Sequence, residues 1–226
     1  MASFEQHING AVIATGVMLT PVYSANIISI NEALALLAFG TIGGILPDLD
    51  SENSKPIQIS FKIISVILPF IVILFISGNM SIVGILTTWL ITSAILHFLF
   101  FRAFINLTVH RGIFHSIPMG LLLGQVTIMM LNTIFSIDII LSTLSGIFLF
   151  FGFIIHLVLD ELVSLNALGL YMKKSLGSAL KVYDKRNLKG TLILYLLIIL
   201  SFVLFPLEID ILFDLLDELS TLTFKS

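Results

Sequence analysis

Histidine and aspartate residues occur in four separate parts of this sequence, with spacings that could hold a metal ion. The seven candidate ligands are His7, Asp48, Asp50, His110, His115, His156 and Asp160. The chain has no cysteine, so imidazole and carboxylate groups are the only strong metal ligands available. One four-coordinate zinc ion can bind at most four of these seven residues. We therefore predict one or two divalent ions, and these ligand types favour zinc.

His156 and Asp160 are four residues apart in a segment that is predicted to be helical, so their side chains share one face. Both can bind one metal ion, or the aspartate can orient the imidazole. The alternative is a hydrogen bond between the two side chains at a helix end, without metal. Glu161 points about 100° away around the same helix and is a candidate general acid or base.

Asp48 and Asp50 follow Pro47, which ends a predicted helix. A turn at this point would bring the two carboxylates together as ligands for zinc or for a hard cation. Asp50 is also a candidate general base. The alternative is a helix-ending turn with no further role.

His110 and His115 bracket a short loop in which Gly112 can bend the backbone. Arg111 suits bidentate recognition of a phosphate or carboxylate, so it is the candidate substrate contact. The alternative is that Arg111 extends to the lipid headgroups beside the next helix. Ser116 is expected to cap that helix.

His7 lies just before the first predicted span. A single histidine at a membrane interface is commonly structural. His7 is a candidate ligand because the other histidine and aspartate clusters are predicted to lie at the same depth in the membrane. His97, near the end of the fourth predicted span, is expected to pack or to support the ligands from outside.

Composition indicates an integral membrane protein. The 226 residues are 58% hydrophobic and 11% charged, with a mean hydropathy of +1.11, and apolar segments of about 17 to 25 residues can cross a bilayer as helices. We predict an all-α, polytopic bundle of about seven transmembrane spans. The predicted spans are 8–28, 32–47, 61–77, 81–101, 115–133, 138–160 and 190–206. They form one membrane-embedded domain over 1–206, followed by an acidic amphipathic helix in the tail 207–226.

Basic residues set the predicted orientation. Ten of the eleven Lys and Arg residues fall on the same side of the predicted spans as the candidate ligands, and the exception is Lys225. The positive-inside rule makes this side cytoplasmic. No basic face for nucleic acid is present, so the expected partners are the lipid bilayer and a small-molecule or lipid substrate.

The ordered motifs resemble the YdjM-like family of bacterial inner-membrane metal-dependent hydrolases. The resemblance rests on His7, on the Gly44 to Asp50 segment followed by Ser54, on His110-Arg111-Gly112-x-x-His115-Ser116, and on His156-x-x-x-Asp160. It covers residues 7 to about 165. It implies a multi-pass protein of the inner membrane with a zinc-type hydrolase site. One departure is Ser51, where relatives often have a histidine after the second aspartate.

Three functions fit these residues. The first is a metal-dependent hydrolase that acts on a phosphorylated or lipid-linked substrate at the cytoplasmic interface, through a water activated by the metal. The second is a transporter that relays ions or protons through the same histidines and aspartates. The third is a non-catalytic membrane protein whose metal is structural and closed by four protein ligands. The His-Glu-x-x-His motif of site-two proteases and the Gly-x-Ser-Gly motif of rhomboids are absent.

Overall fold

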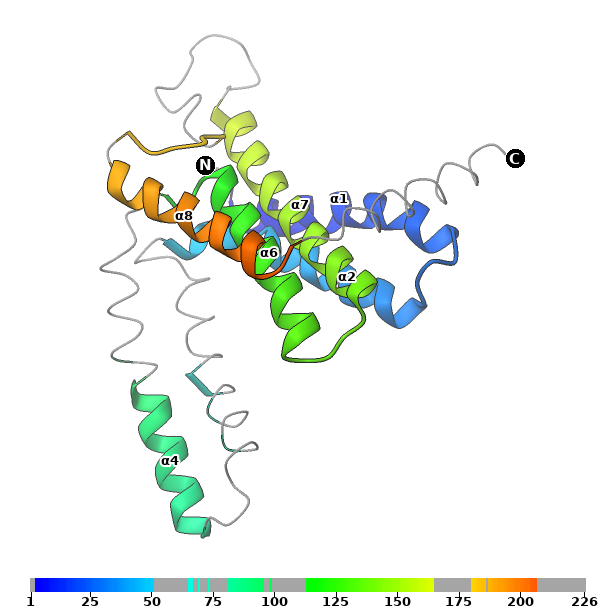
Figure 1. The fold of residues 1–226 in the computed structure, drawn as a ribbon. Coiled ribbons are helices and arrows are strands. Elements are labelled where there is room, and N and C mark those ends of the chain that lie inside the picture. Colours follow the sequence, from blue (N-terminus) through cyan, green and yellow to red (C-terminus); the bar gives the residue numbers. More distant parts are fainter. Residues whose placement is uncertain are drawn as a thin grey trace. The chain divides into compact units, whose positions relative to one another are not determined.

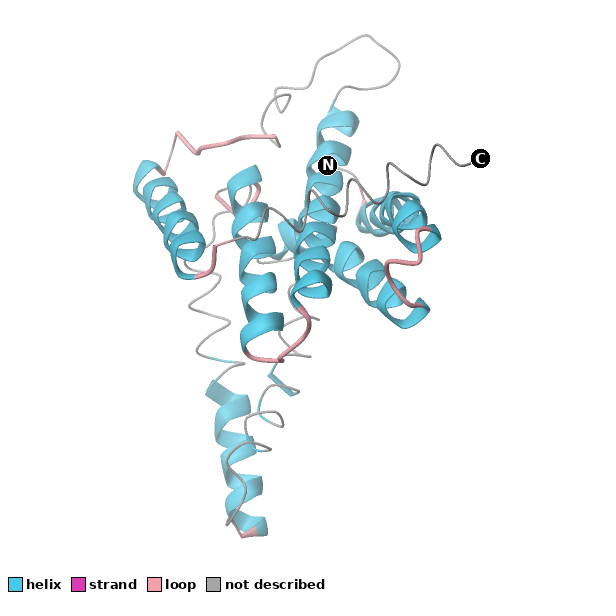
Figure 2. Ribbon diagram, turned by 45° about the vertical axis from the view of Figure 1, so that its right-hand side comes forward, coloured by secondary structure: helices cyan, strands magenta, loops and turns pink. Residues whose placement is uncertain are grey.

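The computed structural model describes residues 3–50, 65–66, 69, 73, 81–95, 98, 113–164, 180–185 and 187–206. The elements are α1 (Phe4–Ser24), α2 (Ile30–Gly43), the short 3-10 helix η1 (Leu46–Asp50), α4 (Ile82–Ala94), α6 (Ile117–Thr133), α7 (Ile139–Ser164) and α8 (Leu188–Leu204). Every regular element in this described part is a helix, and none is a strand (Figures 1 and 2). The prediction of an all-α protein is therefore confirmed for these residues.

The chain divides into two units. The first unit comprises Met1–Pro47 and Ile113–Ser226, and the second comprises Asp48–Gly112. In the first unit α7 is central: it contacts α1, α2 and α6, while α8 packs on α6 (Figure 1). Within this core Phe148 and Phe153 of α7 are fully buried. They belong to two hydrophobic clusters, one shared with α1 and α2 and the other with α6 and α8.

Glycine residues allow α7 to approach its neighbours very closely. On the α2 side, a Cβ atom at Gly152 would overlap the backbone oxygen of Gly40, and one at Gly43 would overlap that of Leu149. On the α6 side, a Cβ at Gly146 would meet the backbone oxygen of Gly124. Small residues at helix interfaces are typical of membrane proteins, where close van der Waals packing replaces the hydrophobic driving force. These contacts fix how far α2 and α6 can slide along α7.

Two helix starts carry a reciprocal capping arrangement. Ser3 accepts a hydrogen bond from the backbone of Gln6, whose side chain in turn accepts from the backbone of Ser3. Ser29 and Glu32 do the same at the start of α2. Such caps satisfy backbone N–H groups that have no partner inside the helix. Because of this cap, α1 begins at Phe4 rather than at residue 8, and the prediction that His7 precedes the first helix is wrong.

Two of the described helices are long and apolar enough to cross a membrane, namely Ile30–Asp48 and Ile139–Val163. The helices α4, α6 and α8 are apolar but shorter. The predicted total of about seven spans therefore stays a prediction. The predicted span at 61–77 lies almost entirely outside the described residues, and the predicted tail helix lies wholly outside them.

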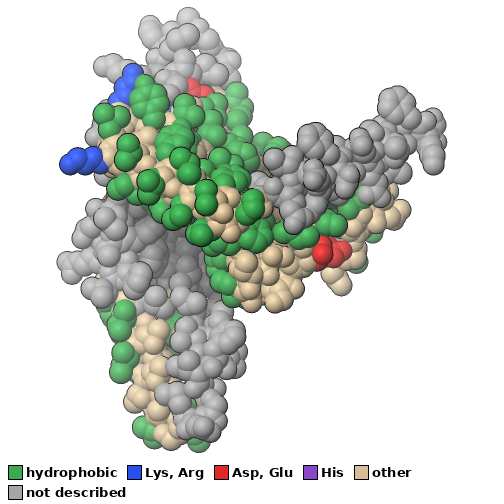
Figure 3. Space-filling model, in the orientation of Figure 1, with side chains coloured by type: hydrophobic (Ala, Val, Ile, Leu, Met, Phe, Trp, Pro, Cys, Tyr) green, Lys and Arg blue, Asp and Glu red, His purple; other side chains and the backbone are tan. Residues whose placement is uncertain are grey.

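Exposed apolar side chains cover the described outer surfaces in both units. In α8, Leu192, Ile199 and Val203 are each more than 60% exposed, and Figure 3 shows many hydrophobic side chains on the described surface. In the second unit, Ile82 and Val83 of α4 are at least 70% exposed. Large exposed apolar surfaces mark contacts with a membrane or with another protein, so these helices have the surface that a lipid bilayer requires.

Candidate metal centre

Four of the seven predicted ligands lie together at one end of the first unit. His7 is in the first turn of α1, His115 lies two residues before the start of α6, and His156 and Asp160 are near the end of α7. Each is at most 1% exposed. Ionisable groups are very rarely buried this deeply unless they pair with one another or bind a metal ion. Their burial together therefore makes this cluster a candidate site.

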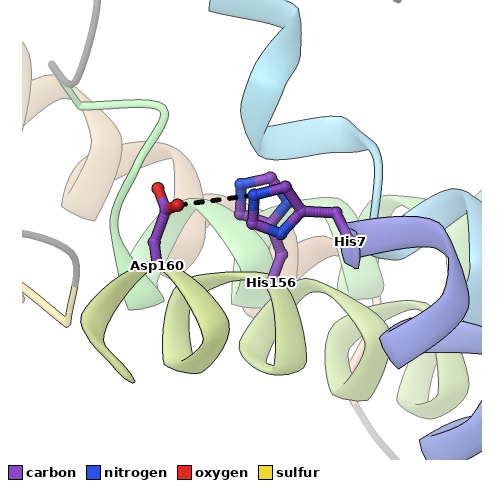
Figure 4. Close-up of side chains that lie close together, drawn as sticks. All are labelled: His7, His156 and Asp160. Atoms are coloured by element: carbon purple, nitrogen blue, oxygen red, sulfur yellow. Dashed lines mark ion pairs between the residues drawn. The ribbon is translucent and has the colours of Figure 1, made fainter. Parts of the chain in front are cut away.

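His7 and His156 form the centre of this cluster. Their rings are stacked, with centroids 3.6 Å apart and planes 11° from parallel. Asp160 lies beside the stacked pair, with its Oδ1 atom 3.4 Å from Nε2 of His7 (Figure 4). Ligand atoms of these three residues all lie within 4.8 Å of one another.

His115 approaches the same aspartate from another element. Its Nε2 atom is 3.8 Å from Oδ2 of Asp160, so the two carboxylate oxygens face different histidines. The ring of His115 is inclined by 70° to that of His156, and their centroids are 5.5 Å apart. Three imidazoles from three elements therefore surround one carboxylate.

A backbone carbonyl fixes the orientation of His156. Its Nδ1 atom lies 2.7 Å from the carbonyl oxygen of Gly44, at the end of α2. Because the carbonyl can only accept, Nδ1 carries the proton and donates, which leaves the lone pair on Nε2. Histidines that bind metal are commonly oriented in this way by a carbonyl or carboxylate on the other ring nitrogen.

The close approach of α2 and α7 explains how this hydrogen bond forms. Gly152 and His156 are four residues apart on α7, and Gly40 and Gly44 are four residues apart at the end of α2, so each pair lies along one helix face. The contact between Gly152 and Gly40 is one turn away from the bond between His156 and Gly44. The glycine contact thus sets the register that brings the Gly44 carbonyl to the imidazole.

The residues present fit a metal ion by both distance and chemistry. The separations of 3.4 Å and 3.8 Å from Asp160 to His7 and His115 exceed the roughly 2.7 to 3.2 Å of a good hydrogen bond. Two ligand atoms on a tetrahedral zinc ion with bonds of about 2.0 to 2.1 Å would lie about 3.3 to 3.4 Å apart. The set of imidazole and carboxylate donors is one that zinc and other divalent transition metals accept.

The roles of the remaining predicted residues stay predictions. Asp48 lies on η1 and belongs to the second unit, so its role as a ligand stays a prediction. The side chain of Asp50, together with His110, Arg111 and His97, lies outside the described residues. Glu161 follows Asp160 on α7 and is partly buried. Its role as a general acid or base also stays a prediction.

Ser116 only partly matches its predicted role. It occupies the N-cap position of α6, but its side chain makes no capping hydrogen bond. Its hydroxyl donates to the carbonyl oxygen of Ile113 instead. This bond closes the turn that carries His115, so the serine supports the ligand rather than the helix start.

Sequence reasoning missed two polar groups near the site helices. The carbonyl of Gly44 was missed because residue types do not show which backbone oxygen will accept a side-chain hydrogen bond. The spacing of Gly40 and Gly44 was the one available signal, because it is compatible with close helix packing. Thr15 is fully buried on α1, and its hydroxyl has no hydrogen-bond partner among the described residues. It lies over Gly40, whose missing Cβ leaves it room.

Comparison with known proteins gave one finding. The family model described as YdjM inner membrane protein matches residues 1–206. That range covers every helix described above and all seven candidate ligands. Comparisons with curated proteins and with solved structures gave no match.

Proposed function

The chain belongs to the YdjM inner membrane protein family, and from this membership we propose that it is a membrane-bound metal-dependent hydrolase. The observation that carries the proposal is the buried cluster of His7, His156 and Asp160. Burying three ionisable groups against one another costs free energy, because each loses its hydration. A protein whose helices served only as an anchor would gain nothing that offsets this cost.

The residues of the cluster have distinct roles in this proposal. His156 and His7 would bind through a ring nitrogen, and Asp160 would bind while offsetting part of the positive charge. A bound divalent ion supplies Lewis acidity, which lowers the pKa of a water molecule and polarises the group to be cleaved. Glu161 and Asp50 are the proposed general acid or base, and Arg111 the proposed substrate contact.

Membership of an inner-membrane family and two helices long enough to cross a bilayer place this chain in contact with lipid. A lipid-linked or phosphorylated substrate is therefore the proposed class. We propose that the chain crosses the membrane several times. From the distribution of the basic residues we infer that the substrate reaches the site from the cytoplasmic side.

The test uses the full chain purified in detergent. Elemental analysis after acid digestion should find stoichiometric divalent metal, with zinc expected. Hydrolysis of phosphomonoester, phosphodiester and lipid phosphate probes should be lost on treatment with a chelator and restored by metal. His156→Ala should lose both metal and hydrolysis, whereas the matched control Ser145→Ala, on the same helix, should retain both.

Three other outcomes would contradict the proposal. A preparation without stoichiometric metal, in which Asp160→Ala changes nothing, would rule out a metal centre. Uptake of an ion or solute into proteoliposomes that His156→Ala abolishes, without any hydrolysis, would indicate a transporter. Stoichiometric metal that is closed by four protein ligands and accompanies no hydrolysis would indicate a structural role.

A further inference from the structure

The stacking of His7 on His156 restricts how the two rings can share a metal ion. An imidazole nitrogen binds metal through a lone pair that lies in the plane of its ring. The ring planes here are 11° from parallel and the centroids are 3.6 Å apart (Figure 4). The lone pairs therefore lie in two nearly parallel planes and do not converge on one point.

A single ion between the two rings would be poorly bound. Midway between the planes it would lie about 1.8 Å outside each of them, whereas its bonds to nitrogen would be only about 2.0 to 2.1 Å long. Each bond would then leave its ring at a steep angle, away from the lone pair. Two ions, one in each ring plane, avoid this conflict. Their separation would be close to the roughly 3.5 to 4 Å found in two-metal hydrolytic sites.

Asp160 has the geometry of a bridge between two such ions. Its Oδ1 atom faces His7 at 3.4 Å and its Oδ2 atom faces His115 at 3.8 Å. A carboxylate that served one ion would not need its two oxygens to face different imidazoles. His115 and His156 are inclined to each other by 70°, so their ring planes intersect and their lone pairs can meet on one ion.

We infer that this centre binds two divalent ions that share Asp160 as a bridging ligand. His7 with Oδ1 of the aspartate holds the first ion. His115 and His156 with Oδ2 hold the second. The inference rests on the proposed metal-dependent function and deepens it. The four ligands named here supply one negative charge against the four positive charges of two divalent ions, which favours an anionic substrate such as a phosphate ester.

The experiment counts metal ions per chain. Full-length protein in detergent is loaded with Zn²⁺ alone, freed of excess metal, and analysed for zinc and protein. Two ions per chain are expected in the unaltered protein and in Ser145→Ala. His7→Ala and His115→Ala should each retain one ion. One ion in the unaltered protein and none in either variant would overturn the two-ion arrangement.

A spectroscopic measurement keeps the inference testable if a variant fails to fold. The unaltered protein loaded with Mn²⁺ should give the exchange-coupled electron paramagnetic resonance signal of two neighbouring ions. In folded Asp160→Asn the coupling should weaken, because an amide bridges poorly. An uncoupled signal from fully loaded, unaltered protein would overturn the inference. One uncoupled ion with intact hydrolysis would leave the proposed function standing, whereas absence of bound metal would remove both.

Discussion

The two ends of α7 bury polar groups in different ways. Near its start, Ser142 and Ser145 are at most 1% exposed, and their hydroxyls donate to the nearby carbonyls of Ile137 and Leu141. Near its end, His156 is equally buried, but its partner is the carbonyl of Gly44, 112 residues away in the sequence.

This difference distinguishes polar groups that are buried only as part of the helix from polar groups that form a candidate site. A hydroxyl group can be satisfied by a backbone carbonyl four or five residues earlier in the chain, so its burial requires no partner from another helix. An imidazole or a carboxylate has no such local partner, and it is buried only where other elements supply one. The end of α7 that meets His7 of α1 and His115 of the loop before α6 is therefore the proposed functional end.

The largest effect is expected at the carboxylate that two imidazoles face. Asp160→Ala should lower metal affinity by more than about 100-fold, because loss of supporting partners around a metal site alone costs roughly 10- to 100-fold. Titration against a chromophoric chelator measures this. If Asp160→Ala kept the metal affinity of the unaltered protein, the buried polar groups at the end of α7 would be structural, like those at its start.

A smaller effect is expected from the contact that sets the register between α2 and α7. In Gly152→Ala the added Cβ would overlap the backbone of Gly40, which should cost about 1 to 3 kcal/mol of stability. Displacement of Gly44 from His156 should also lower metal affinity by roughly 10- to 100-fold.

The matched control is Gly146→Ala, which introduces a similar clash on the α6 side of the same helix, against Gly124. It should lose comparable stability in thermal unfolding and keep its metal affinity. An equal loss of affinity in both variants would mean that general packing, rather than the α2 register, supports the site.

A still smaller effect is expected at the start of α1. Ser3→Ala removes the cap of the turn that carries His7 and should weaken that turn by about 1 kcal/mol. Since 1.4 kcal/mol corresponds to about tenfold in binding, metal affinity should fall by no more than roughly 10-fold. Ser29→Ala removes the equivalent cap from α2, at the helix end remote from Gly44, and should leave affinity unchanged. Equal effects would contradict a specific role for the α1 cap.

The smallest effect is expected at the other end of α7. Ser145→Ala removes one hydroxyl whose bond is to its own helix at 2.7 Å, so stability should change by about 1 kcal/mol or less. Metal content and hydrolysis should be unaltered. A loss of metal in this folded variant would contradict the view that its burial is only structural.

The sequence predicted the helical class and most helix positions well. Long apolar segments between polar turns indicated α2, α6, α7 and α8 to within four residues at each end. The same holds for α1, but its start was predicted four residues late because its first turn is polar and is stabilised by the cap from Ser3 and Gln6. An apolar pattern does not record such a cap, so His7 was assigned outside the helix.

Local spacing by itself determined that His156 and Asp160 share a face, because 3.6 residues per turn fix the angle between positions four apart. Only the tertiary structure decided that His7 stacks on His156, that His115 faces the second oxygen of Asp160, and that the Gly44 carbonyl orients a ring. These contacts depend on the register between helices that are distant in sequence. That register is set by glycine contacts such as Gly40 with Gly152, whose partners cannot be identified from residue types alone.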